Sequence, residues 1–169
     1  MAPQNRDLLI EDCRLLFRNF SGEQTQFNAR GDRNFCIALP NDLASSMEKD
    51  GWNIKYLKPR EDGDEPQAYV KVKINFNGRP PKVVMVTSRN KTSLDESAAG
   101  LLDYADILTA DVILNPYDWT VNGNTGRTAY LQSIFVTIRE TELDLKYSDI
   151  PEASHVNRHE FDPETGELL

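Results

Sequence analysis

The sequence QAYVKVKINFNGRPPKVVMVTS, which covers Gln67–Ser88, has a period of two residues. Apolar side chains occupy every second position over 70–76, while Tyr69 and polar residues fill the positions between them. This alternation predicts a β-strand with one buried face and one exposed face. Asn77-Gly78 predicts a turn, and the apolar run from Val83 predicts a second strand.

The exposed face of the predicted strand carries Tyr69, Lys71 and Lys73. A sheet face that alternates an aromatic ring with lysines suits the bases and phosphates of a nucleic acid. The same lysines could serve only to keep an exposed sheet face soluble. On this stretch alone, solubility is the favoured interpretation.

Strands also predominate in the rest of the chain. Four segments are rich in apolar residues of the kinds that strands favour, and we expect strands over 8–20, 33–39, 52–57 and 110–117. The first should be long and bent, although a helix over 8–16 is an alternative. The third should form a hairpin with the central strand, and Pro116 should place the fourth at an edge or end it.

A second hairpin is predicted around the turn residues 122–126, with its return strand over 127–139. Strict alternation along this return strand puts Ala129, Leu131 and Phe135 on one face. It puts Ile134 and Val136 on the other. Because both faces then carry apolar residues, we expect this strand to be central or heavily covered.

Two short helices are expected. The first runs over 41–50, with Asn41 or Asp42 as its N-cap. The second runs over 94–104, because Ser93 and Glu96 have the spacing of a capping box. The predicted fold class is therefore mainly β, an OB-fold-like antiparallel barrel with two short helices and a flexible acidic C-terminal tail. An immunoglobulin-like sandwich is the alternative, but it offers no natural position for the second helix.

The charge is distributed unevenly along the 169 residues. The net charge is −8, and residues 140–169 account for −7 of it with nine acids and two bases. Residues 1–139 hold 18 acids and 17 bases, so the acidity belongs mostly to the tail. We expect an OB-like nucleic-acid-binding domain over 1–147 and a disordered acidic tail over 148–169. The low isoelectric point is then a weak objection to nucleic-acid binding.

Composition also indicates the compartment. No apolar run approaches the roughly 18 residues of a membrane span, and the N-terminus lacks a signal-peptide pattern. We therefore expect a cytoplasmic protein without membrane contact. Cys13 and Cys36 are too few for a disulfide framework and should be buried free thiols. No cofactor is expected; the sequence does not determine the oligomeric state, and a homodimer is possible.

The sequence shows no catalytic constellation, so we do not expect an enzyme. The histidines are His155 and His159 in the predicted tail, and two ligands in such a segment are weak support for a metal site. No phosphate-binding or nucleophile motif is present. Asp103, Asp106 and Asp111 could form a carboxylate cluster, but surface roles are the simpler interpretation. No metal site is therefore assigned.

A nucleic-acid binder needs cations for phosphates and rings for bases, and the middle of the chain supplies both. Residues 50–91 hold nine bases against five acids, four of which lie in 61–65. The candidate phosphate contacts are Lys55, Lys71, Lys73, Arg79, Lys82 and Arg127. The candidate stacking residues are Tyr69, Trp119 and Trp52, of which Trp119 and Trp52 could instead be core residues. The acidic tail would compete with nucleic acid for the basic surface and, once displaced, bind partner proteins; an inert solubilising tail is the alternative.

Three segments carry a resemblance to a known family: DGWNIKYLKPRED (50–62), GRPPKVVMVTS (78–88) and NPYDWTVNGNTGRTAYLQSIFVTI (115–138). Together they resemble the small single-stranded DNA-binding proteins encoded by tailed bacteriophages, over residues 8–147. The resemblance implies an OB core that stacks bases and contacts phosphates, and a tail that recruits replication or recombination proteins. Several relatives end their tail in an aromatic residue, whereas this chain ends in Leu169 after a last aromatic at Phe161.

The sequence therefore predicts a phage protein that binds single-stranded DNA with little sequence preference during DNA replication or recombination. Two other functions stay open at this point. A protein-interaction adaptor or DNA-mimic inhibitor would use clustered acids on the barrel, and a metal-dependent nuclease would use the aspartates named above.

Overall fold

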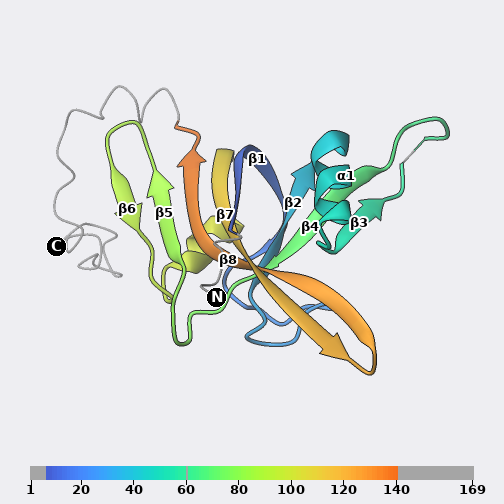
Figure 1. Ribbon diagram of the computed structural model, residues 1–169. Coiled ribbons are helices and arrows are strands. Elements are labelled where there is room, and N and C mark those ends of the chain that lie inside the picture. Colours follow the sequence, from blue (N-terminus) through green and yellow to red (C-terminus); the bar gives the residue numbers. More distant parts are fainter. Residues whose placement is uncertain (1–6, 60, 141–169) are drawn as a thin grey trace, which may run out of the picture. The chain divides into compact units, whose positions relative to one another are not determined.

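The computed structural model describes residues 7–59 and 61–140, and it divides the chain into two compact units, Met1–Arg139 and Glu140–Leu169. All elements named below belong to the first unit (Figure 1). The predicted boundary at 147/148 and the predicted disordered tail lie outside the described residues. Neither helical segment among the described residues has the length and apolar character needed to cross a membrane.

Ten elements follow one another along the first unit, eight strands, one α-helix and one 3-10 helix. They are β1 (Leu8–Asn19), β2 (Asn34–Leu39), α1 (Asn41–Lys49), β3 (Ile54–Leu57), β4 (Gln67–Lys73), β5 (Lys82–Val86), β6 (Lys91–Ser93), η1 (Ala99–Asp103), β7 (Ile107–Val121) and β8 (Asn124–Ile138).

Five of the strands close into a ring. The sheet order is β3-β4-β2-β1-β7-β8-β5-β6, and an additional pairing joins β4 to β8. The ring therefore runs β1-β2-β4-β8-β7 and returns to β1, with β4 and β8 parallel and the other contacts antiparallel. Counted within the ring, the strand order is 1-2-3-5-4, the Greek-key order of an OB barrel. The predicted OB-like fold is confirmed.

The core of the barrel comes from the apolar faces that the alternation predicted. Val70 and Val72 of β4 are fully buried, as are Phe35 and Ile37 of β2. The two β2 residues pair with the two β4 residues, so these inward faces stack in register. The neighbouring β4 residues Tyr69, Lys71 and Lys73 lie on the opposite side, as predicted, but only Lys73 is exposed, and Tyr69 and Lys71 are half-buried.

The first strand is bent, as expected, and the bend has a visible cause. Its pairing register shifts between Ile10 and Cys13, where it faces β7, and between Leu16 and Asn19, where it faces β2. Each shift contains a residue with positive φ, Asp12 and Phe17, both at 51°. Bulges of this kind insert an extra residue and turn a strand, which lets β1 serve two partners.

The return strand of the second hairpin corrects the expected alternation. Ile113 pairs with Ser133 and Leu114 pairs with Leu131, so Gln132 is an extra residue in β8. This bulge shifts the inward set from the odd positions 129 and 131 to the even positions 134 and 136. The buried apolar residues of both predicted faces therefore belong to one interior, whereas Phe135 is half-buried and lies outside the core cluster.

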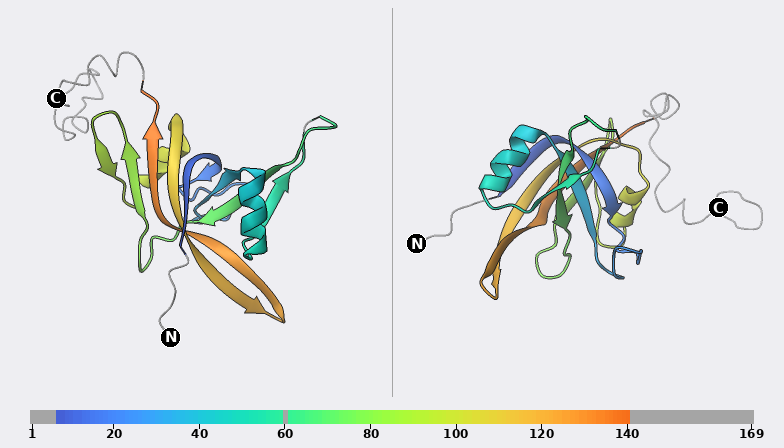
Figure 2. Two further views of the ribbon diagram at one scale, coloured as in Figure 1. Left: turned by 45° about the horizontal axis from the view of Figure 1, so that its top comes forward. Right: turned by 90° about the vertical axis from the view of Figure 1, so that its right-hand side faces the viewer.

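The β7–β8 hairpin is longer than predicted, because β7 continues through Pro116 to Val121. Pro116 is tolerated because β1 pairs with β7 only as far as Leu114, so the missing N–H faces no neighbouring strand. Asn122 (φ 50°) and Gly123 (φ 81°) form the two-residue turn, with the positive dihedrals of a type I′ hairpin. The hairpin extends away from the barrel in all three ribbon views (Figures 1 and 2).

The two predicted helices have different outcomes. The first is confirmed as α1, although its N-cap is Pro40, with no side-chain cap bond from Asn41 or Asp42. The second is wrong as an α-helix: Ser93 ends β6, and η1 begins at Ala99. Here Asp95 accepts hydrogen bonds from the Ser97 hydroxyl and the Ala98 N–H, so an Asp-centred turn replaces the expected capping box.

Candidate nucleic-acid interface

The outward side of β4 and its neighbours forms one surface, which we call the basic face: Lys55 on β3 and Tyr69, Lys71 and Lys73 on β4, with Cys36 and Ala38 beside them on β2. Strand register makes these residues neighbours, since Lys71 pairs with Cys36 and Tyr69 pairs with both Ala38 and Lys55. The small side chains of Cys36 and Ala38 on β2 thus lie beside the larger side chains of Lys71 and Tyr69 on β4. The register places three predicted phosphate contacts and one predicted stacking residue on this face.

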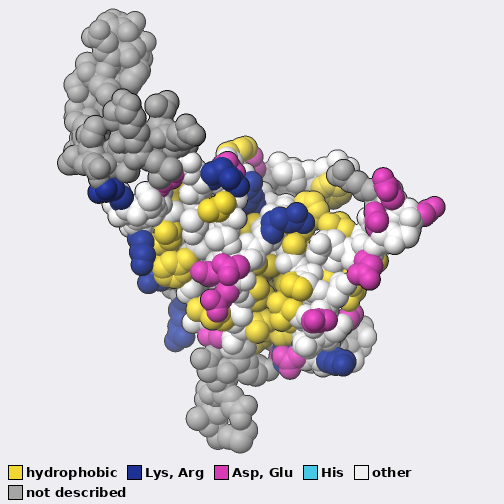
Figure 3. All heavy atoms as spheres, turned by 90° about the horizontal axis from the view of Figure 1, so that it is seen from above, with side chains coloured by type: hydrophobic (Ala, Val, Ile, Leu, Met, Phe, Trp, Pro, Cys, Tyr) yellow, Lys and Arg dark blue, Asp and Glu magenta, His cyan; other side chains and the backbone are white. Residues whose placement is uncertain are grey.

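Cys36 reports the electrostatics of the basic face. Burial raises the pKa of its thiol, and the positive charges of Lys71 and Lys55 oppose this by favouring the thiolate. Both ammonium groups therefore lie close enough to influence a negative charge on this face. In the space-filling view, acidic side chains lie at the projecting β3–β4 loop, which contains Glu61, Asp62, Asp64 and Glu65, and also in the middle of the face shown (Figure 3).

Phe17 joins the basic face and was not among the predicted contacts. Its ring is 61% exposed and meets the edge of the Tyr69 ring at a centroid distance of 6.1 Å. The bulge at the end of β1, with φ of 51° at Phe17, accompanies this exposure. Sequence reasoning treated Phe17 as an ordinary strand residue, because periodicity gives no sign of where a bulge will fall.

A second group of aromatic side chains adjoins the basic face at the β4–β8 seam. Lys73 pairs with Tyr130 across this seam. Tyr130 in turn makes an edge contact with Tyr117 at 6.0 Å between centroids. We call the hairpin over 115–130 the aromatic arm. Because cross-strand partners share a face, Tyr117, Trp119 and Tyr130 lie on the same side of the arm, and that side continues from Lys73.

Trp119 lies against the opposite strand of the arm. It pairs with Gly126, and a Cβ added at that glycine would come within 2.3 Å of the indole carbon Cζ2. Its Nε1–H donates to the Thr128 hydroxyl at 3.2 Å. Gly126 therefore allows the indole to approach the strand closely, and the ring is still 38% exposed. This geometry leaves part of the ring exposed, and base stacking by Trp119 stays a prediction.

Trp52 and Arg127, two further predicted DNA contacts, do not lie on the exposed surface of the arm. Trp52 is 4% exposed and belongs to the core cluster, so its ring offers no face to a base. Arg127 pairs with Asp118 and Asp50 and lies over the Trp52 ring, with 14% of its side chain exposed. The expected base stacking by Trp52 and phosphate contact by Arg127 are both corrected. The two residues are far apart in the sequence, so their contact in the fold could not be predicted from it.

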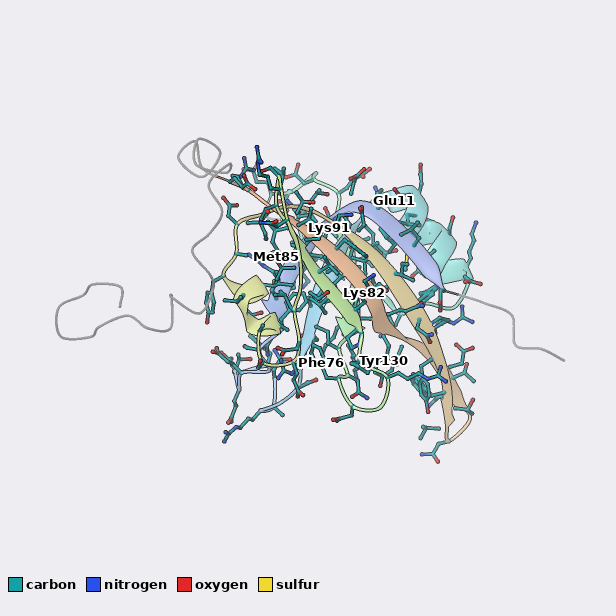
Figure 4. The ribbon with its side chains drawn as sticks, turned by 90° about the vertical axis from the view of Figure 1, so that its left-hand side faces the viewer. Glu11, Phe76, Lys82, Met85, Lys91 and Tyr130 are labelled. Carbon is teal, nitrogen blue, oxygen red and sulfur yellow. The ribbon has the colours of Figure 1, made fainter. Side chains whose placement is uncertain are left out.

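Lys82 begins β5, and Arg79 belongs to the segment that leads from β4 to β5. β4 and β5 both run parallel to β8, at Ala129–Tyr130 and at Ser133–Thr137, so they follow one another along it. The segment 74–81, which carries exposed Arg79, is thus a link between successive strands and not a hairpin loop. The Nζ of Lys82 lies 5.3 Å from the centre of the Phe135 ring. Figure 4 shows this side of the molecule, with Lys82, Met85 and Tyr130 labelled.

The loop over 20–33, between β1 and β2, is another region that sequence reasoning passed over. In OB folds the corresponding loop commonly contacts ligands. Its base is fixed by Asp103, which accepts hydrogen bonds from the backbone N–H groups of Phe20 and Ser21. Phe27, within the loop, is 86% exposed. An exposed aromatic residue in a loop rich in turn residues was the available signal.

The aspartates considered for a nuclease have structural partners. Asp103 holds the loop just described, Asp106 pairs with Arg139, and Asp111 accepts the Asp12 backbone N–H. Across residues 7–59 and 61–140, the structure contains no group of three or more potential metal ligands. His155 and His159 lie outside the described residues.

Comparisons with known proteins agree with this geometry. A search of curated proteins finds no match. Among solved structures, the chain is similar to the single-stranded DNA-binding protein of bacteriophage Enc34 in complex with single-stranded DNA, with a TM-score of 0.53 and 10% identity over 80% of this chain and 88% of that chain. It is also similar to that Enc34 protein in another structure, with a TM-score of 0.52 and 10% identity over 92% and 90% of the two chains. At this identity the likeness concerns the fold.

A family model provides the assignment. The model described as "Putative phage ssDNA-binding domain" matches residues 2–165, nearly the whole chain. The protein, with its five-stranded OB ring, belongs to this family of phage single-stranded-DNA-binding domains.

Proposed function

We propose that this protein binds single-stranded DNA with little sequence preference, in the cytoplasm of the bacterial host, during replication or recombination of phage DNA. The observation that carries the proposal is the pairing of Lys73 with Tyr130. It joins the basic face to the aromatic arm, so phosphate-binding and base-stacking groups share one continuous surface. Family membership supports the choice of single-stranded DNA as the ligand.

The two halves of this surface have complementary tasks. Lys55, Lys71 and Lys73 attract phosphates, with Arg79 and Lys82 extending the positive charge along β8. Phe17, Tyr69 and Trp119 offer ring faces, and each stacked base contributes about 1–3 kcal/mol. Stacking accepts any base, because every base has a π-face, and lysine contacts to phosphate carry no sequence information. Binding should therefore tolerate different sequences.

Titration of a fluorescent oligo-dT at several salt concentrations tests the proposal. The logarithm of the association constant should fall by about 0.7 per tenfold rise in salt for each neutralised phosphate, so engagement of all five cations gives a slope of about −3.5. The control is a duplex of the same length, which should bind more weakly because its bases are not free to stack. Failure of both the full-length and the tail-truncated protein to bind at low salt would refute the proposal.

The acidic tail has a separate role in the proposal. Residues 140–169 carry a charge of −7 and are tethered to a protein with a basic face. A tethered anion competes at high effective concentration, and its displacement by DNA frees it to recruit replication or recombination proteins. Removal of 148–169 should raise the affinity for oligo-dT, most strongly at low salt. Equal or lower affinity of the truncated protein would contradict the competition.

The proposed activity is binding without catalysis. The support is structural, since Asp103, Asp106 and Asp111 are each engaged by backbone N–H groups or an arginine. Incubation of labelled single-stranded DNA with the protein and Mg²⁺ or Mn²⁺ should leave the DNA intact. A metal-dependent nuclease activity that shortens the DNA, copurifies with the protein and persists in repeated preparations would refute the proposal of binding without catalysis.

A further inference from the structure

Arg127 lies on the side of the aromatic arm opposite to Trp119. Its Nε–H donates to Asp118 Oδ1 at 2.7 Å and an Nη2–H donates to Asp118 Oδ2 at 3.3 Å. Its Nη1 donates to the backbone oxygen of Asp50 at 2.7 Å and to Asp50 Oδ2 at 3.1 Å. The arginine thus connects β7, β8 and the residue that ends α1.

Trp52 contacts both Arg127 and Asp50. The Arg127 guanidinium carbon lies 5.5 Å from the centre of the indole ring, and the indole Nε1–H donates to Asp50 Oδ2 at 3.2 Å. Because Trp52 is a core residue, the contact ties the arm to the rigid part of the barrel. We call Asp50, Trp52, Asp118 and Arg127 the arm clamp.

The arm has reason to need such a clamp. Beyond Leu114, β7 has β8 as its partner in the described structure, and the residues from Tyr117 to Thr125 are exposed. A two-stranded ribbon without a packed face is marginally stable at best in water. Contacts between the arm and the end of α1 therefore fix the direction in which the arm points.

Arg127 is poorly suited to bind phosphate itself. A guanidinium has five N–H donors, and four of them serve Asp118 and Asp50 in this structure. The two carboxylates also offset its positive charge locally. A phosphate that approached this site would meet two acids around one base, which makes the attraction weak.

We infer that Arg127 is a positioning residue: through Asp118, Asp50 and Trp52 it holds the aromatic arm in the orientation that aligns Tyr117 and Trp119 with the basic face. This inference rests on the proposed function, because it concerns how the DNA-binding surface is assembled. It predicts that the arginine acts on DNA affinity without contributing a phosphate contact.

Salt dependence separates the two roles. Arg127→Gln should lower the affinity for oligo-dT about tenfold at every salt concentration and leave the salt slope unchanged. Loss of a phosphate contact would instead reduce the slope by about 0.7. Arg127→Lys keeps the charge and loses the fork, so it should be as impaired as Arg127→Gln. Arg139→Gln, which breaks the exposed pair with Asp106, is the matched control and should bind normally.

A double-mutant cycle identifies the ring through which the clamp acts. If Arg127 positions Trp119, Arg127→Gln should lower affinity far less in a Trp119→Ala background than in the wild type. Equal losses in both backgrounds would overturn the inference. So would a reduced salt slope together with near-normal binding by Arg127→Lys.

Hydrogen exchange of the free protein distinguishes a failure of the clamp from a failure of the proposed function. Amides of residues 117–128 should exchange at least several-fold faster in Arg127→Gln than in the wild type, and at wild-type rates in Arg139→Gln. Unchanged exchange in the arm would refute the clamp even if the protein binds DNA. Faster exchange in Arg127→Gln than in the wild type, together with failure of the wild-type protein to bind DNA, would support the clamp and refute the proposed function.

Discussion

Phe17 of β1 meets Tyr69 of β4 edge to face, with ring centroids 6.1 Å apart and ring planes at 73°. The two rings come from strands that are separated by β2 in the sheet. An exposed phenylalanine at positive φ is unfavourable for the folded chain, since both the backbone and the hydrated ring oppose it. Such features tend to persist where function requires them.

The Phe17 ring should therefore contribute to DNA affinity and little to stability. Phe17→Ala should weaken oligo-dT binding by about 5- to 150-fold, the range that corresponds to loss of one stacked base at 1–3 kcal/mol. Thermal unfolding of the variant should match the wild type within a few degrees. Leu9→Ala, a similarly exposed apolar residue on the same strand, is the control for loss of surface area. Equal binding by both variants would show that Phe17 stacks no base.

Lys71 and Lys73 should act through phosphate neutralisation. Lys71→Gln and Lys73→Gln should each reduce the salt slope of oligo-dT binding by about 0.7 and weaken binding most at low salt. Lys49→Gln, at the exposed end of α1, removes the same charge away from the basic face and should leave the slope unaltered. A slope that responds equally to all three substitutions would indicate a general charge effect.

Gly126 should be required for the placement of Trp119. In Gly126→Ala the added Cβ would come within 2.3 Å of the indole, so the ring must move away from the strand. We expect about tenfold weaker DNA binding and a shifted Trp fluorescence emission, with little loss of global stability. The control is Thr120→Ala, on the opposite side of the arm. If Gly126→Ala bound DNA as the wild type does, Trp119 would not need its observed position.

The buried Cys13 thiol should make the free energy of unfolding fall as the pH rises into the alkaline range. Burial raises the pKa of its thiol from an ordinary value of 9.0 to about 12. Between these values the unfolded chain loses the thiol proton and the folded chain keeps it, so ionisation favours the unfolded state as pH rises above 9. The free energy of unfolding should fall more steeply over this range in the wild type than in Cys13→Ala. Urea titrations at pH 8, 9 and 10 measure the difference, and parallel slopes would contradict it.

Much of the fold could be predicted from local patterns. The alternation in β4 gave both its faces correctly, because its apolar and polar residues alternate without interruption. The turn at Asn122-Gly123 was likewise visible, since few other residue pairs accept two positive φ values. The same rule failed in β8, where the bulge at Gln132 exchanges the faces within the strand.

The site was predictable in its strand positions and not in its long-range contacts. Tyr69, Lys71 and Lys73 lie as expected because strand periodicity determines their side. Trp52 and Arg127 were each chosen for a chemical type that DNA favours, yet the fold pairs them with one another. Phe17 was missed because its exposure accompanies a bulge and a positive φ, and neither leaves a sequence signature in LLIEDCRLLFRN.

The parallel contact between β4 and β8 consists of two residue pairs, Val72 with Ala129 and Lys73 with Tyr130. This short junction is where the ring of strands is completed and also where the cationic and aromatic halves of the surface meet. A ligand that contacts both the basic face and the aromatic arm therefore spans this β4–β8 junction. Bound DNA should therefore slow the hydrogen exchange of the backbone amides at these two residue pairs by more than the overall stabilisation that binding gives the protein. The ligand would then help to keep the barrel closed.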